Sequence, residues 1–207
     1  MSFTLTTYRF ILALLLLPLL GAALSLQQSF IFDGDGGCRA SYTWSVPRNA
    51  LGVIEASREY FAGKNCGNFL DSKAVTRHFT SFDGIKVLSS NRYETENAVI
   101  CRVLVFASDA RKAFAEGAFG ALRLIDSPAA PGDLEFSGAL PEFTADGEGT
   151  RAALCELLGG VELTLTVTTP TAVIEATGEK KRFDQVQWHL TSPDYLKGIC
   201  PKIFVRW

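Results

Sequence analysis

The chain has 207 residues, of which 47% are hydrophobic and 20% are charged. This composition is typical of a protein with a packed core and excludes an intrinsically disordered chain. The 20 basic and 22 acidic residues give a formal net charge of −2 at pH 7, which excludes the basic footprint of a nucleic-acid-binding protein. The length fits one large domain or two small ones, and we expect a single α+β domain over residues 26–207.

Residues 1–25 have the organisation of a secretory signal peptide. Arg9 is the only charged residue before position 33, and the apolar run Phe10–Leu24 ends among small residues. The run is shorter than the ~20 residues that a membrane span needs. We expect cleavage after Ser25; cleavage after Ala23 and an uncleaved anchor are the alternatives. The protein is then secreted or periplasmic, with no transmembrane span in its mature part.

The first predicted elements follow an Asp- and Gly-rich turn at 33–37. Apolar residues alternate with small hydroxyl residues over 38–46, which predicts a half-buried antiparallel strand. An amphipathic helix is predicted over 47–62, beginning at a proline. A shorter helix is predicted over 71–82, with Asp71 as its N-cap.

The middle of the chain alternates between strands and a helix. Residues 85–90 and 97–106 are predicted to pair as strands. The second is apolar on both faces, which favours a central strand covered on both sides. A capped helix is predicted over 108–117. The segments 121–126 and 134–139 are predicted to form a hairpin.

The last third predicts one helix and several strands. A short helix over 150–158 ends at a Gly-Gly pair. Apolar and polar residues alternate strictly over 161–168, the clearest strand pattern in the chain. Further strands are predicted over 171–177 and 186–190. The element order predicts an α+β fold with a mainly antiparallel sheet.

The five cysteines all lie after the signal-like segment and are the disulfide candidates: Cys38, Cys66, Cys101, Cys155 and Cys200. No two are spaced as Cys-x-x-Cys, so neither zinc-ribbon nor thioredoxin-type chemistry has its short-range geometry. Export permits disulfides. We expect two disulfides and one buried free thiol, and the pairing stays open. Cys38 and Cys101 share parity with inward residues, so they are candidates for disulfide partners or for inert core thiols.

No motif in the chain predicts catalysis. The two histidines, His78 and His189, have no accompanying nucleophile signature and are interpreted as surface residues. Asp33 and Asp35 begin like a calcium loop, but Trp44 stands where the last glutamate of that loop belongs, so a tight turn is the preferred interpretation. We therefore expect no catalytic residue, no metal site and no cofactor.

Two segments carry a resemblance to a known family. The Asp-Gly turn with its strand at 33–46, and the helix, Gly-Gly, strand and V-x-W-x-L pattern at 154–190, resemble exported bacterial envelope proteins of the LppM-domain type. The resemblance implies a curved antiparallel sheet packed with helices, similar to the START/Bet v 1-like fold. This chain has no cysteine between residues 20 and 28, unlike the lipidated members. The family supplies no catalytic residues.

Two functions of different classes follow. The first is a non-catalytic binding module whose sheet and helices enclose an apolar or lipid-like ligand. The alternative is an envelope protein with a filled core that acts through protein–protein contacts or as a structural element; a hydrolase is the third. The residues expected to face inward in either case are Trp44, Phe106, Leu165 and Trp188. A cavity of roughly 300 Å³ or more would favour the binding module.

Overall fold

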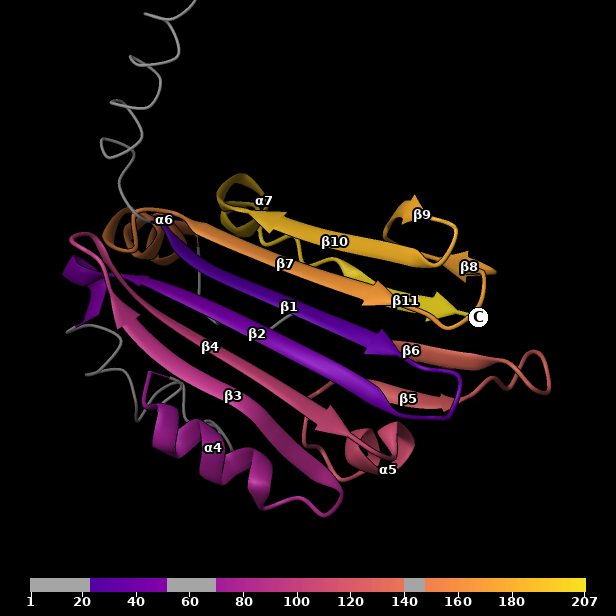
Figure 1. Ribbon diagram of the computed structural model, residues 1–207. Helices are drawn as coiled ribbons and strands as arrows, with labels where there is room; N and C mark the ends of the chain where they lie inside the picture. Colours follow the sequence, from indigo (N-terminus) through magenta and orange to yellow (C-terminus); the bar gives the residue numbers. More distant parts are fainter. Residues whose placement is uncertain (1–22, 52–69, 140–147) are drawn as a thin grey trace, which may run out of the picture.

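The computed structural model describes residues 23–51, 70–139 and 148–207. Their strands form two sheets, a large one and a small one (Figure 1). In spatial order, the large sheet contains β3 (Ile85–Glu94), β4 (Ala98–Ala107), β2 (Cys38–Pro47), β1 (Leu24–Phe32), β7 (Val161–Thr168), β10 (Gln185–Thr191) and β9 (Glu179–Arg182). The small sheet contains β5 (Arg123–Asp126), β6 (Leu134–Ala139), β11 (Lys202–Arg206) and β8 (Glu175–Ala176).

The predicted fold class is confirmed. Within the described residues, the paired strands are antiparallel except for β1 and β7, which run parallel in the middle of the large sheet. The described helices are η2 (Arg48–Ala50), α4 (Ser72–Thr80), α5 (Ala110–Ala115), α6 (Glu148–Leu157) and α7 (Ser192–Leu196). The small sheet lies behind the large sheet in Figure 1. We call the face of the large sheet toward the small sheet its inner face and the opposite one its outer face.

Local sequence signals placed several elements correctly. Asp71 caps α4 by accepting a hydrogen bond from the Lys73 backbone at 2.9 Å, and Asp109 caps α5 through the Lys112 backbone at 2.9 Å. Such caps satisfy N–H groups that the first helical turn leaves without partners. The predicted strand pairs β3–β4 and β5–β6 are both present. Most of the helix expected over 47–62 lies outside the described residues.

Strand β1 is the largest departure from the sequence-based expectation. It was not predicted, yet it is a central strand that pairs with β2 on one side and β7 on the other. Its alternate residues Leu24, Leu26, Phe30 and Phe32 are all buried. The alternation was missed because the strand begins inside the apolar run that was assigned to the signal peptide.

The aromatic residues of β1 join the two sheets. Phe30 is fully buried, and its ring centroid lies 5.4–5.5 Å from those of Phe114, Phe119 and Phe136. These partners come from α5, the segment after it, and the small sheet. Separations of this size are those of directly packed aromatic pairs. The inner face over Phe30 is therefore filled by side chains.

Two expectations about the strands are wrong. Strand β4 was expected to be covered on both faces, but Ile100, Leu104 and Phe106 are only half-buried. No described helix or strand covers the outer face there (Figure 1). Phe106 therefore lies on the outer face and not inside. The strand expected over 171–177 is reduced to β8, which pairs with β11 in the small sheet.

The position of β1 predicts where an exported chain is cleaved. Leu24 is 3% exposed, and its backbone N–H donates to the carbonyl oxygens of Leu158 and Gly160. Cleavage after Ser25 would remove these contacts, whereas cleavage after Ala23 leaves β1 complete. Intact-mass measurement of the exported protein is expected to give Leu24 as the first residue. A mature chain that starts at Leu26 would contradict this prediction.

Candidate functional site

One polar side chain interrupts the apolar inner face at the centre of the large sheet. Gln28 occupies an inner-face position of β1, between the buried residues Leu26 and Phe30. Its cross-strand neighbours are Tyr42 on β2 and Leu165 on β7, both buried. An amide in such surroundings destabilises the fold unless it has a hydrogen-bond partner.

Within the part of the chain that the structure describes, neither Gln28 nor its neighbour Tyr42 has such a partner. Among the described residues, none forms a hydrogen bond with the Gln28 amide or the Tyr42 hydroxyl. The Gln28 side chain is half-buried, and Tyr42 is 6% exposed. Burial raises the pKa of Tyr42, which keeps its hydroxyl neutral and able to donate. The pair thus presents unused donors and acceptors on an apolar face.

Trp44 extends this group of side chains along β2. Its ring stacks on that of Tyr42, with centroids 5.4 Å apart and planes 9° from parallel. Trp44 remains half-buried on a face where its direct partner Leu26 is 6% exposed. We define Gln28, Tyr42 and Trp44 as the inner-face site. Its aromatic rings and two polar groups can hold an apolar molecule that carries a hydrogen-bonding group.

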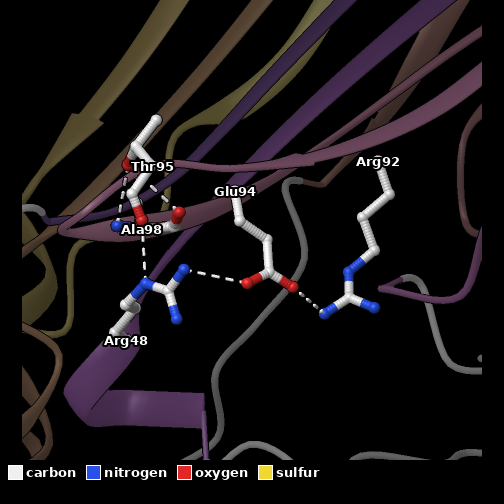
Figure 2. A network of polar contacts seen from close by, with 5 residues as sticks. All are labelled: Arg48, Arg92, Glu94, Thr95 and Ala98. Carbon is white, nitrogen blue, oxygen red and sulfur yellow. Dashed lines mark hydrogen bonds and ion pairs between the residues drawn. The ribbon is translucent and has the colours of Figure 1, made fainter.

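The edge of the inner face carries a charged network. Arg92 and Glu94 occupy inner-face positions of β3, since their partners across β4 are Cys101 and Val99, both buried. Figure 2 shows the Glu94 carboxylate between two guanidinium groups. Arg48 donates to Oε2 and Arg92 donates to Oε1, each at 2.8 Å. Arg48 Nε also donates to the Thr95 carbonyl at 2.8 Å, which fixes its orientation (Figure 2).

A separate cleft of about 300 Å³ lies at the Asp-Gly turn, where Phe32 and Trp207 form part of its lining. Asp33 accepts hydrogen bonds from the backbone of Gly37 and Asp35, at 2.7 and 3.2 Å. The Asp33 carboxylate therefore stabilises the Asp-Gly turn. The described part of the chain contains no group of three or more residues suited to hold a metal ion.

The histidines occupy structural positions. His78 was interpreted as a surface residue, but it is half-buried, and its Nε2 lies 3.3 Å from the Ala118 carbonyl oxygen. Its ring also contacts Phe79 and Phe82. His189 lies on the outer face as expected, with Nε2 3.3 Å from a Glu162 carboxylate oxygen.

The expectation of two disulfides is not met. Cys38, Cys101 and Cys155 are buried free thiols, and two disulfides would require four of the five cysteines. Cys38 lies opposite Ala107, whereas Cys101 lies opposite Trp44 at the other end of the strand pair. At ~3.4 Å per residue they are roughly 20 Å apart, against a limit of ~7 Å between the Cα atoms of a disulfide. Cys200 is exposed, and Cys66 lies outside the described residues.

The buried thiols are held protonated by their surroundings. Burial raises the pKa of Cys38 to about 12, and it also raises the pKa of Cys101 and Cys155. The Cys101 thiol donates to the Leu70 carbonyl at 3.5 Å. Reactive cysteines have lowered pKa values and partial exposure, so these three residues have the character of core side chains.

The fold and the inner-face site define a class: an α+β protein whose large, mostly antiparallel sheet packs its inner face against helices and a second sheet. Among solved structures, the folded domain of LppM from Mycobacterium tuberculosis, determined by NMR, has this fold. The match has a TM-score of 0.51 and 16% sequence identity, and it covers 90% of each chain. The resemblance inferred from sequence is therefore confirmed at the level of the fold.

The other comparisons found no relative. No family model matches the chain, and no curated protein matches it. Within the described ranges, no helix is long and apolar enough to cross a membrane.

Sequence reasoning did not identify the inner-face site as a unit. Trp44 was expected to face inward, and Tyr42 has the same parity, but Gln28 was not singled out. The signal was present in β1, where a single glutamine replaces an apolar residue in the alternation from Leu24 to Phe32. Recognising it required knowing that β1 is a strand of the sheet.

The free thiols lead to a prediction about cysteine chemistry. A thiol reagent is expected to titrate at least three cysteines in denaturant, because Cys38, Cys101 and Cys155 are unpaired. Native protein at mildly alkaline pH is expected to leave Cys38 unmodified, because its raised pKa keeps it protonated. A count of one thiol in denaturant would restore the two-disulfide expectation.

The same pKa shift gives stability a pH dependence with a defined sign. An unfolded chain loses the Cys38 proton near the ordinary cysteine pKa of ~8.5, whereas the folded protein keeps it until about pH 12. The contribution of Cys38 to the free energy of unfolding is therefore complete below pH ~8.5 and declines above it. A Cys38→Ala variant is expected to lose this part of the decline in urea titrations.

The unpaired amide of Gln28 predicts that its removal stabilises the ligand-free protein. Gln28→Leu is expected to raise the free energy of unfolding by about 1 kcal/mol, because an unsatisfied amide on an apolar face is replaced by an apolar side chain. Gln27→Leu, on the outer face of the same strand, is the matched control and should change stability by less than about 0.5 kcal/mol. Destabilisation by Gln28→Leu alone would show that the amide supports the fold.

Proposed function

We propose that the protein is a non-catalytic binding module that holds an apolar or lipid-like ligand at the inner-face site. The observation that carries the proposal is the Gln28–Tyr42 pair, whose polar groups have no hydrogen-bond partner among the described residues. Residues that lower the free energy of unfolding and make no evident structural contribution are characteristic of functional sites. A ligand with one hydrogen-bonding group would satisfy the pair and cover the apolar surface around it.

The surroundings of the site support an apolar ligand. Leu26, Leu163 and Leu165 flank it on β1 and β7, and Trp44 provides an aromatic wall that is still half-buried. Binding pockets for small molecules combine such apolar and aromatic linings with a few polar groups that set orientation. No described side chain supplies a nucleophile next to a base at this site, so binding is favoured over catalysis.

The proposal includes export to the cell envelope. Its support is the signal-like segment over residues 1–25 and the likeness in fold to LppM. The acidic balance of the chain, 20 basic against 22 acidic residues, gives no electrostatic attraction to anionic membrane surfaces. A ligand-binding role in a soluble exported chain agrees with the signal-like segment and with the acidic balance.

A second candidate function rests on an exposed apolar patch near β9. Phe183 is 73% exposed and Ile174 is 53% exposed. The backbone N–H of Val173, the residue before Ile174, donates to the Phe183 carbonyl at 2.8 Å, so the two segments run side by side. Exposed apolar side chains that cluster mark protein–protein contacts. A Phe183→Ser, Ile174→Ser variant that loses a complex while keeping ligand affinity would favour this function.

The direct test is recovery of a ligand with the native protein. Protein purified from its own exported fraction is analysed by native mass spectrometry, followed by solvent extraction. An apolar compound bound at a near-stoichiometric level is the expected result. Repeated recovery of empty protein, combined with no binding of a fluorescent fatty acid, would contradict the binding module.

Adjacent glutamines on β1 allow a matched prediction about affinity. Gln28→Leu is expected to weaken binding of a fluorescent fatty acid roughly fivefold, the equivalent of one lost hydrogen bond of about 1 kcal/mol. Gln27→Leu faces the opposite side of the sheet and should leave the affinity unchanged. Equal affinities of the two variants for the fatty acid in a fluorescence titration would show that Gln28 does not contact the ligand.

A further inference from the structure

The charged network at the edge of the inner face lies in line with the inner-face site. Arg92 on β3 is opposite Cys101 on β4, and Cys101 is opposite Trp44 on β2. Arg92 and Trp44 are thus two strands apart in one row across the sheet, about 10 Å at the usual strand spacing. Cys101 lies between them, and its thiol donates to the carbonyl of the buried Leu70, so a molecule with its apolar part at Trp44 and its end at Arg92 would pass over Leu70.

The network has the geometry of a site for an anion. Two guanidinium groups converge on one carboxylate, with Arg48 and Arg92 each 2.8 Å from a different oxygen of Glu94 (Figure 2). Planar guanidinium groups recognise carboxylate and phosphate in this way. The hydrogen bond from Arg48 to the Thr95 carbonyl positions one of the two groups in advance.

The network also has the charge and exposure that exchange requires. Two positive groups share one negative group, which leaves a net charge of +1 for the three residues. The side chains of Arg48 and Arg92 are each 46% exposed and that of Glu94 is 44% exposed. Ion pairs at such exposure contribute little net free energy, so an external anion can compete with Glu94.

We propose that Arg48 and Arg92 bind the anionic headgroup of an amphiphile whose apolar chain lies at the inner-face site. The Glu94 carboxylate holds the two guanidinium groups in position in the empty protein, and the ligand displaces it. The ligand class is thereby narrowed to apolar chains that end in a carboxylate or a phosphate. This inference rests on the proposed function, since the apolar part of the ligand binds at Gln28, Tyr42 and Trp44.

The test compares ligands that share a chain and differ in charge: palmitate, hexadecyl phosphate and hexadecanol. Calorimetric or displacement titrations measure each affinity for the wild type and for Arg92→Gln and Glu94→Gln. Arg92→Gln is expected to weaken binding of an anionic ligand about tenfold, the usual order for one charge-assisted contact, and to leave hexadecanol unchanged. Glu94→Gln is expected to strengthen anionic binding several-fold, because it removes the competing carboxylate.

A matched control and the contrary outcomes complete the test. Lys86→Gln removes a positive charge from the outer face of the same strand, where Lys86 pairs with Phe106, and should change no affinity. The anion that loses more affinity in Arg92→Gln identifies the headgroup as carboxylate or phosphate. If palmitate, hexadecyl phosphate and hexadecanol respond alike to Arg92→Gln, the headgroup inference is wrong while the binding module stands. If the wild type binds none of the three, the binding module itself is contradicted.

Discussion

The packing of Phe30 against Phe114, Phe119 and Phe136 is the interaction on which the arrangement of the two sheets depends. Phe30 lies on β1, a central strand of the large sheet, and Phe136 lies on β6 of the small sheet. Together these rings fill the space between the sheets around Phe30 and leave Phe30 with no exposed surface. Aromatic side chains bury much apolar surface in defined geometries, so this cluster sets the spacing of the two layers.

The inner face beside Phe30 has a different character because the residue two positions before Phe30 is a glutamine. The aromatic packing continues from Phe30 through Tyr42 to the half-buried Trp44, and the Gln28 amide and the Tyr42 hydroxyl add two polar groups to it. In the proposed function, Phe30 contributes stability and Gln28, at the middle of β1, contributes to binding. The network of Arg48, Glu94 and Arg92 adds charge at the edge of the inner face.

The parts of the fold that could be predicted are those specified by local sequence. Alternation placed the strand 161–168, and the capping carboxylates Asp71 and Asp109 placed two helices, because both signals depend on a few neighbouring residues. Strand β11 could not be placed this way, since its five residues are held by pairing with β6 and β8. Cysteine spacing likewise carried no information about pairing, which depends on where distant strands meet. Tyr42 and Trp44 were predictable as inward residues. The inner-face position of Gln28 could be inferred only once β1 was known to be a central strand of the sheet.

The central claim is that an apolar ligand binds on the inner face beside Gln28. The most direct measurement is NMR of the isotope-labelled protein during titration with palmitate, observing the side-chain amide groups of Gln27 and Gln28 and the indole N–H of Trp44. The account predicts that the Gln28 and Trp44 signals shift with saturation while the Gln27 signal stays in place. Shifts confined to Gln27, or to none of these groups in the presence of bound palmitate, would contradict it.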